Sequence, residues 1–371
     1  MYLCTCMTKK GYDTEITDLF FALIRCSIGK EEQLPHTPTP EQWQELFDIS
    51  KKQTLAGIIF AGIERLPQEQ RPPKALLLQW YLLRENIKNA NISLNKKVVA
   101  VSRKFKAEGF NNSILKGQGI AQLYPNPLLR TPGDIDIWLE GGSDKVISFI
   151  RTIAPDCKPT YHHVDFNISN EVDIEVHYRP TWMYSPRTNK RLQKYFAKYE
   201  AMQFSNTVSA GDEEFNAPTP AFNMVYIPIH IYRHLFSEGI GLRQILDYYY
   251  VLMQSLSDTE REECKAVLIS VNLKRFMQSL MYVMQQIFHL DENYMLFKPD
   301  KKGGEFLMHE IMTAGNFGHH DTRYKEKGEG YSLALMYNLV KRMFILVPRH
   351  PSEVLWAPIF KIWHFFWCKN H

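Results

Sequence analysis

The sequence is poor in the features that mark secreted or membrane-spanning proteins. Its 371 residues contain six cysteines, and no two of them form a C-x-x-C pair. A disulfide framework is not expected in a chain of this length, so reduced thiols are the default. No long apolar segment opens the chain, and the apolar run "MFILVP" is too short to cross a bilayer. We therefore expect no signal peptide and a cytoplasmic location.

An excess of charge of one sign is also lacking. The formal net charge is only +4 at pH 7, and there is no basic stripe with interleaved aromatic residues of the kind that binds nucleic acid strands. We expect no long nucleic acid as a partner, although a small anion such as a nucleotide remains compatible. Internal repeats and low-complexity segments are absent too, which favours an ordinary globular protein.

The C-terminal segment "WAPIFKIWHFFWCKNH" is unusually rich in tryptophan and phenylalanine. Such a stripe is typical of a helix that packs against its own domain, and we favour that interpretation. The alternative is peripheral contact with a membrane surface or a protein partner.

Three regions differ in their hydrophobic period. Residues 1–110 and 216–371 show apolar residues at helical spacing, interrupted in the first region by the breaker "LPQEQRPP". Residues 111–215 mix short alternating runs with one helical run. The pattern predicts an α+β protein with a central α/β core, residues 111–215, between an N-terminal helical region and a C-terminal helical domain.

The central region contains at least four predicted strands. "NSILKG" is a short apolar run that ends in glycine, and "DIDIWL" alternates. "SDKVISFIRTIA" returns to helical spacing, with Ser143 as the expected N-cap. "HHVDFNI" and "VDIEVHY" both alternate, and the polar "SNE" between them suits a hairpin turn.

The polar sides of the alternating segments are rich in acids and histidines. Successive strand side chains point to opposite faces, so each segment has one apolar side and one polar side. A solvent-exposed sheet face would be expected to carry lysine and threonine, and no lysine occurs at these positions. A group of neighbouring carboxylates indicates protonation or a bound cation. The polar positions are Asp134 and Asp136, then His163, Asp165 and Asn167, then Asp173, Glu175 and His177.

The segment "LKGQG", residues 115–119, gives the acid face a second component. A strand that ends in glycine and enters a helix exposes backbone N–H groups, and a nearby lysine adds positive charge. A tight turn explains these glycines equally well when they are taken alone. A phosphate cradle beside a carboxylate pair is a more specific combination, because metal–triphosphate chemistry needs both.

These stretches carry a family resemblance. "ILKGQGIAQLYPNPLLRTPGDIDIWL", followed by "YHHVDFNISNEVDIEVHYRP", resembles the uncharacterised nucleotidyltransferase family of the polymerase-β-like nucleotidyltransferase superfamily. The resemblance covers most of the chain and is strongest from about Leu115 to Asp247. It implies a polymerase-β-like core, with a small mixed sheet and helices on one face, flanked by N- and C-terminal helical regions.

The resemblance also implies a set of catalytic and metal-binding acids. Asp134 and Asp136 match the superfamily's metal-binding pair, and Glu175 is the best match for its third acid. Asp173 and Asp165 are the competing candidates for that third position. The implied cofactor is Mg²⁺, with two ions expected and Mn²⁺ as the alternative.

A further set of residues matches the phosphate-binding positions. Gly117 and Gly119 lie where the superfamily's glycine motif contacts the triphosphate, and Lys116 and Arg130 match basic positions. The chain departs from the usual Gly-Ser or Gly-Gly pattern, because Gln118 follows Gly117. The insertion "YPNPLLRTPG" also lengthens the link to the aspartates, so the phosphate contacts are less well defined than the metal pair.

Four histidines have two interpretations each. His163 and His177 could touch a phosphate or orient an acid, but histidines hydrogen-bonded within a polar sheet face are commoner. His230 and His234 are spaced i, i+4 and could in principle bind zinc. Because no third ligand is evident, we interpret them as a pair on one helix face.

Charged residues outside the strands also allow two interpretations. Arg130 suits bidentate contact with phosphate, and it equally suits a loop arginine paired with an acid. Arg243 and Asp247 have the spacing of an intrahelical salt bridge. The family resemblance makes a structural or substrate-facing role the alternative for this second pair.

The implied reaction is transfer of a nucleotidyl group from a nucleoside triphosphate (NTP) to an acceptor, with release of pyrophosphate. The sequence does not identify the acceptor, which we expect to be a small molecule, a sugar or a protein. One alternative is a nucleotide-binding or scaffolding protein with little turnover, motivated by the missing serine after Gly117. The other is a small-molecule phosphotransferase.

Overall fold

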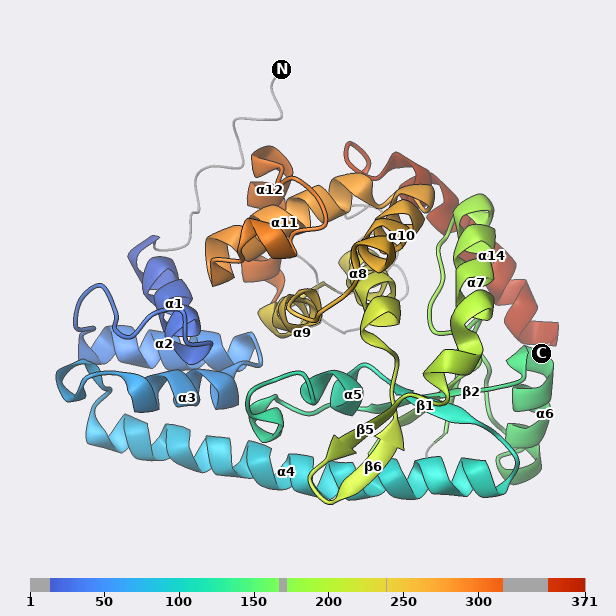
Figure 1. Cartoon of the computed structure of the whole chain (residues 1–371), viewed down its shortest axis with the longest axis horizontal. Helices are drawn as coiled ribbons and strands as arrows, with labels where there is room; N and C mark the ends of the chain where they lie inside the picture. Colours follow the sequence, from blue (N-terminus) through green and yellow to red (C-terminus); the bar gives the residue numbers. More distant parts are fainter. Residues whose placement is uncertain (1–13, 167–171, 238, 316–345, 371) are drawn as a thin grey trace, which may run out of the picture.

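The structure is a computed structural model that describes residues 14–166, 172–237, 239–315 and 346–370. It is an α+β protein in which a small sheet lies between two groups of helices (Figure 1). The fold class predicted from the sequence is thereby confirmed. Within the described residues, no helix is both long and apolar enough to cross a membrane.

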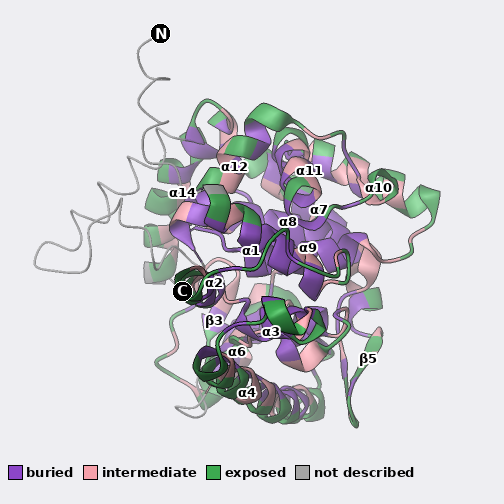
Figure 2. Ribbon diagram, turned by 90° about the vertical axis from the view of Figure 1, so that its left-hand side faces the viewer, coloured by how far each residue is buried: buried purple, intermediate pink, exposed green. Residues whose placement is uncertain are grey.

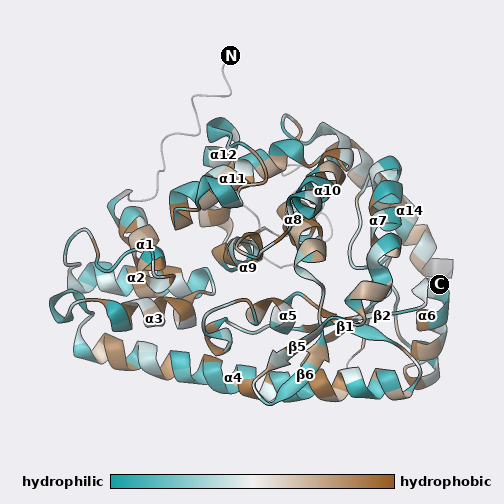
Figure 3. Ribbon diagram, in the orientation of Figure 1, coloured by the Kyte–Doolittle hydropathy of each residue, from teal (hydrophilic) through white to brown (hydrophobic). Residues whose placement is uncertain are grey.

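The N-terminal region is helical, as predicted. A capping box forms at Thr39, whose side chain accepts a hydrogen bond from the backbone of Gln42 at the start of α2. Figure 3 shows brown and teal residues alternating along the long helix α4. Its one-sided apolar pattern lets it run under both the N-terminal helices and the sheet. The helices are α1 (Thr14–Ser27), α2 (Pro40–Lys52), α3 (Ala56–Arg65) and α4 (Lys74–Ala107).

The central sheet has four strands in the order β1-β2-β4-β3. Strands β2 and β4 are parallel, and the two outer pairs are antiparallel. The hairpin pairing predicted for the last two strands is confirmed, while its predicted turn at residues 169–171 lies outside the described residues. The strands are β1 (Asn112–Leu115), β2 (Ile135–Leu139), β3 (His163–Asp165) and β4 (Ile174–His177).

Helices cover the apolar face of this sheet. Alternate strand residues such as Ile137 and Val176 pack with side chains of α4 and of α6 (Gly142–Ile153) in one core. The short helix α5 (Gly117–Ala121) follows β1. On the opposite face, Trp138 packs against Phe222 and Phe204.

Two details of the central region differ from the sequence prediction. Ser143 is not the N-cap of α6; Gly141 is, and the helix already begins at Gly142. Both glycines have positive φ, which turns the chain out of β2 directly into the helix. The hairpin of β5 (Thr207–Ala210) and β6 (Glu213–Asn216) was not predicted, because its sequence is mostly polar.

The C-terminal region is helical, as predicted, and shares its core with the N-terminal helices. Buried residues from α1–α4 and α8–α12 form one hydrophobic cluster. Helices α8 and α9 run through the middle of the molecule and are almost wholly buried (Figure 2). The helices after the sheet are α7 (Pro186–Gln203), α8 (Pro220–Ser237), α9 (Leu242–Leu252), α10 (Asp258–Ser270), α11 (Lys274–Phe288), α12 (Lys301–Ala314) and α14 (Pro351–Asn370).

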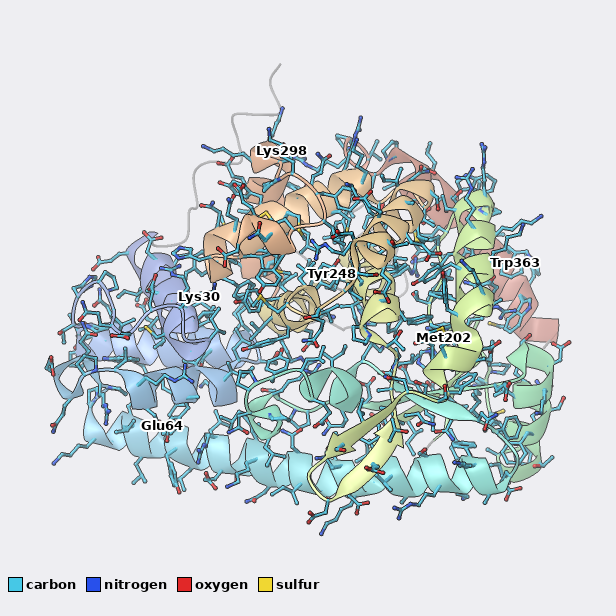
Figure 4. The ribbon with its side chains drawn as sticks, in the orientation of Figure 1. Lys30, Glu64, Met202, Tyr248, Lys298 and Trp363 are labelled. Carbon is cyan, nitrogen blue, oxygen red and sulfur yellow. The ribbon has the colours of Figure 1, made fainter. Side chains whose placement is uncertain are left out.

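The aromatic C-terminal segment forms helix α14, which has two different faces. One face packs on the molecule, with Phe360 against Tyr161, Trp182 and Tyr184. The other face is exposed, and Figure 4 shows Trp363 at the outer margin of the molecule. Both interpretations of the segment therefore keep support, because the helix packs on its own chain and still presents an apolar stripe. The exposed stripe consists of Leu355, Trp356, Ile359, Ile362, Trp363, Phe365 and Phe366.

Candidate active site

The strand register lines up the predicted acids and histidines in two rows on one sheet face. Asp136 lies opposite Glu175, and Glu175 lies opposite Asp165. In the next row, Trp138 lies opposite His177, and His177 lies opposite His163. This face therefore carries a row of carboxylates followed by a row of aromatic rings, two of them imidazoles.

Asp136 is the most buried acid of the first row, with 2% of its surface exposed. Its Oδ1 atom lies 2.8 Å from Lys116 Nζ and 2.8 Å from His177 Nε2. His177 Nε2 also lies 3.2 Å from Glu175 Oε2. A buried carboxylate is costly without such charged partners, so the contacts with Lys116 and His177 offset the cost of burying Asp136.

The same contacts shift the pKa values of His177 and Glu175. Burial alone would lower the pKa of His177, but hydrogen bonds with Asp136 and Glu175 outweigh it and raise the pKa to about 9. Burial alone would raise the pKa of Glu175, but the His177 hydrogen bond and the Lys116 charge lower it to about 2. At neutral pH the Glu175 carboxylate and the His177 imidazole are therefore both charged.

The turn between β1 and α5 is strained at Lys116. This residue has φ 47° and ψ −144°, and Gly117 follows with φ 36°. A non-glycine residue with positive φ costs free energy and persists only where its surroundings hold it. The salt bridge with Asp136 is such a constraint, because it fixes the lysine side chain over the acid row.

The two glycines of this turn have different surroundings. Gly117 lines the cavity described below, and its contact with phosphate stays a prediction. Gly119 is buried, and a Cβ atom there would lie 2.7 Å from the carbonyl oxygen of Ile114. Gly119 thus allows α5 to pack closely on β1 and does not line the cavity. Gln118 also faces the protein interior, where its amide donates to Asn95.

A cavity of about 620 Å³ opens over the polar sheet face. Helices α8 and α9 and the segment that follows β4 form its other walls. Volumes of this size accommodate a nucleotide or a comparable ligand. The charged and histidine residues that line it are Lys116, Arg130, Asp134, Asp136, His162, His163, Glu175, His177, His230, Arg233, His234, Arg243 and Asp247.

The acids predicted from the sequence lie in different environments. Asp134 lines the cavity from just before β2 and is exposed, whereas Asp136 is buried. Asp173 and Asp165 are exposed and do not line the cavity. Of the three candidates for the third acid, Glu175 is the one that faces both the cavity and Asp136.

Arg130 is held by a buried acid from the C-terminal region. Its Nε and Nη2 atoms donate to Asp247 at 2.7 and 2.8 Å, and Tyr124 donates to the same carboxylate at 2.7 Å. Of the two interpretations of Arg130, the structure therefore shows the loop arginine paired with an acid. Arg243 donates to the carbonyl of Thr131 at 2.9 Å, which ties α9 to the segment that carries Asp134.

The histidine pair on α8 also faces the cavity. The Nε2 atoms of His230 and His234 lie 3.0 Å apart. Burial lowers the pKa of His230 well below its usual range, and the nearby Lys116 charge adds to this. Among the described residues, neither histidine belongs to a group of three metal donors. The pair is thus a feature of one helix face, as the sequence suggested.

Sequence reasoning missed three residues of the cavity wall. Arg233 lies with its guanidinium carbon 3.8 Å above the ring of Trp182, and His162 packs against the same tryptophan. Arg233 could have been found, because it lies three residues after His230 and therefore shares its helix face. His162 and Trp182 gave no such signal, since both lie outside the strands.

The donors of the acid row fit a divalent cation. Asp136, Glu175 and His177 place one donor atom each within 4.8 Å of one another. Carboxylate oxygens are the ligands that Mg²⁺ prefers. Asp134 lies on the wall of the same cavity, although no three-donor group of this size among the described residues includes it.

Comparison with known proteins places the chain in a family. No curated protein matches it. Among solved structures, one similar chain is described as "Crystal structure of an antigenic nucleotidyltransferase-like protein from Paracoccidioides brasiliensis". The two are 12% identical with a TM-score of 0.30, over 53% of this chain and 97% of the other. The profile of a family described as "Uncharacterised nucleotidyltransferase" matches residues 39–289. Because that match covers more than half of the sequence, the chain belongs to the uncharacterised nucleotidyltransferase family.

Proposed function

We propose that this protein is a Mg²⁺-dependent nucleotidyltransferase that moves a nucleoside monophosphate from an NTP to an acceptor hydroxyl or similar group. The observation that carries the proposal is the pairing of Asp136 with Glu175 in the cavity that Asp134, Lys116 and Gly117 also line. Acids that hold a metal beside a cationic turn are what triphosphate chemistry requires.

The charged residues that line the cavity would have different tasks in this reaction. Asp134, Asp136 and Glu175 would hold the metal, which neutralises the triphosphate and polarises the reacting oxygens when it is bound. Lys116 forms a salt bridge with Asp136 and brings a positive charge to the acid row. Arg233 and Arg243 add positive charge to the cavity wall, which favours a polyanionic ligand.

The bond changes are those of an in-line displacement. The acceptor oxygen forms a bond to the α-phosphorus while the bond from that phosphorus to the bridging oxygen breaks, and pyrophosphate leaves. The carboxylate of Glu175 remains ionised at neutral pH, so it can accept a hydrogen bond from the acceptor hydroxyl. Catalysis would then depend on positioning and charge stabilisation rather than on a covalent enzyme intermediate.

The cavity also bears on the choice of partners. Its volume suits an NTP and part of an acceptor. We expect the acceptor to be a small molecule, a sugar or a protein side chain rather than a long nucleic acid. The rival functions are nucleotide binding with little turnover and phosphotransfer to a small molecule.

Pyrophosphate release tests the proposal. The protein is incubated with each NTP, Mg²⁺ and mixtures of sugars, aminoglycosides or proteins, using label in either the α- or the γ-phosphate. We expect release of pyrophosphate and transfer of the α-label. The combined change Asp134→Asn and Asp136→Asn should reduce turnover at least about 100-fold.

Asp173→Asn is the matched control. It removes a carboxylate two residues from Glu175 that is exposed and does not line the cavity, so turnover should stay unchanged. Transfer of the γ-label would identify a phosphotransferase. Binding of NTP without any release, unaffected by the double substitution, would contradict the proposal.

A further inference from the structure

Three histidines meet beside the carboxylate row. His162 lies directly before β3, His163 begins that strand, and His177 ends β4. One donor nitrogen of each lies within 4.8 Å of the donors of the other two. All three line the cavity and are at least partly buried. Mg²⁺ chemistry alone does not account for this cluster, because Mg²⁺ prefers oxygen ligands.

One nitrogen of each imidazole points toward the cluster. His162 Nε2 and His163 Nδ1 lie 2.9 Å apart. His163 Nδ1 lies 3.7 Å from Glu175 Oε2, and His177 Nε2 lies 3.2 Å from the same oxygen. Two imidazole nitrogens therefore lie near the same carboxylate oxygen, and His162 Nε2 lies beside one of those two nitrogens.

The other nitrogen of each imidazole has an oxygen partner outside the cluster. His162 Nδ1 lies 3.2 Å from Thr160 Oγ1, and His177 Nδ1 lies 3.4 Å from the carbonyl oxygen of Arg179. His163 Nε2 lies 3.4 Å from Asp165 Oδ1. In metalloproteins, a histidine ligand usually donates its second N–H to a carboxylate, carbonyl or hydroxyl, which orients the ring and selects the tautomer.

We propose that His162, His163 and His177 form a binding site for a transition-metal ion of the Zn²⁺ class, with Glu175 next to His163 and His177. Three histidines, or two histidines with a glutamate, are ligand sets of known catalytic zinc sites. Imidazole nitrogen favours zinc, cobalt, nickel and similar ions over Mg²⁺. The site borders Glu175 of the proposed nucleotide site, but it does not rest on nucleotidyl transfer.

The position of this site gives the bound ion access to a ligand. All four residues line the cavity of about 620 Å³, so an ion held there can be reached by a phosphate or hydroxyl oxygen. His177 lies between this cluster and Asp136, because its Nε2 atom contacts both Asp136 and Glu175. His177 therefore belongs to the proposed transition-metal site and also contacts the neighbouring row of carboxylates.

Metal binding to the full chain, without nucleotide, tests the proposal. The protein is freed of metal with a chelator, loaded with Zn²⁺ or with Mg²⁺, desalted, and analysed for metal content. We expect one Zn²⁺ retained per chain and no retained Mg²⁺. Titration with Co²⁺ should produce the visible absorption of a nitrogen-ligated site, and this measurement needs no variant.

The variants separate the cluster from other histidines of the cavity. His162→Ala with His163→Ala should lower Zn²⁺ affinity at least about 100-fold, and Asp165→Asn should lower it about 10-fold by loosening His163. The matched control is His230→Ala with His234→Ala, which removes a close imidazole pair from the same cavity and should leave affinity unchanged. Circular dichroism checks that each variant folds.

Several outcomes would overturn the proposal. They are a wild-type protein that retains no Zn²⁺ and gives no Co²⁺ absorption, equal retention of Mg²⁺, or loss of Zn²⁺ only in the His230 and His234 variant. Because no NTP is present in these experiments, their failure would leave the pyrophosphate assay as a separate test of nucleotidyl transfer.

Discussion

The buried contact between Arg130 and Asp247 allows a quantitative prediction. Arg130 is 4% exposed and Asp247 6% exposed, and two hydrogen bonds of 2.7 and 2.8 Å join them. Asp247→Asn keeps the shape of the side chain but removes its charge, so it leaves a guanidinium buried without a counter-charge. Loss of one partner of a buried ion pair costs about 3–5 kcal/mol of unfolding free energy.

Arg243 increases the expected cost. Burial and the neighbouring Arg130 charge lower the pKa of Arg243 to about 10, while Asp247 acts against that decrease. Without Asp247, less negative charge offsets the repulsion between the positive charges of Arg130 and Arg243. We therefore expect a cost in the upper part of the range of about 3–5 kcal/mol. A loss of this size is a large share of the roughly 5–15 kcal/mol that stabilises a typical protein.

Urea denaturation followed by both fluorescence and circular dichroism measures the effect. We expect a lower midpoint with an unchanged slope for Asp247→Asn. Tyr124→Phe, which removes one hydrogen bond to the same carboxylate, should cost about 1.5–3 kcal/mol. The combined change Arg130→Met and Asp247→Leu should recover part of the stability lost in Asp247→Asn, because it removes the Arg130 guanidinium together with its counter-charge. A cost below about 1 kcal/mol for Asp247→Asn would refute the reasoning.

Three more predictions concern packing and pH. Gly119→Ala should destabilise the protein by about 1–3 kcal/mol in thermal unfolding, because its Cβ would lie 2.7 Å from a carbonyl oxygen, whereas Gly133→Ala should be nearly neutral. Phe360→Ala should cost about 2 kcal/mol, because this ring packs on three aromatic side chains, and the exposed Ile362→Ala should change unfolding by less than about 0.5 kcal/mol. Burial, and then the charge of a neighbouring arginine, lower the pKa of His350 to about 4. The unfolded chain therefore binds a proton at a higher pH than the folded protein does, and stability should fall as the pH drops from about 6.5 to 4. His350→Phe should remove up to about 3 kcal/mol of that decline in unfolding experiments across this pH range. Equal stability of either matched pair, or an unchanged pH profile, would count against the corresponding explanation.

The sequence was most informative in the strands, where polar and apolar residues alternate and the alternation determines which side chains share a face. Alternation placed Asp136, Glu175 and His177 on one strand face, and the strand register puts them there. The helical regions followed from their apolar spacing in the same way. Both inferences depend on local patterns, which a single sequence carries.

Contacts between distant segments could not be predicted in this way. The spacing of Arg243 and Asp247 indicated a salt bridge within one helix, but the carboxylate of Asp247 binds Arg130 and Tyr124, 117 and 123 residues away. The two glycines after Lys116 looked equivalent, and only the position of Ile114 separates the cavity-lining Gly117 from the packing Gly119. Ser143 was a reasonable cap by residue type, but the positive φ of two glycines starts the helix earlier.

The shared core of the N- and C-terminal helices has a consequence for synthesis of the chain. Helix α1 packs against α11, which begins about 250 residues after α1 ends. At a translation rate of roughly 5–20 residues per second, α1 waits about 10–50 s for that partner. During this time α1, whose apolar side chains are buried in the finished protein, lacks the cover that α11 provides. A newly made chain is therefore a natural client for chaperones that bind exposed apolar helices, and faster translation of the second half would shorten that dependence.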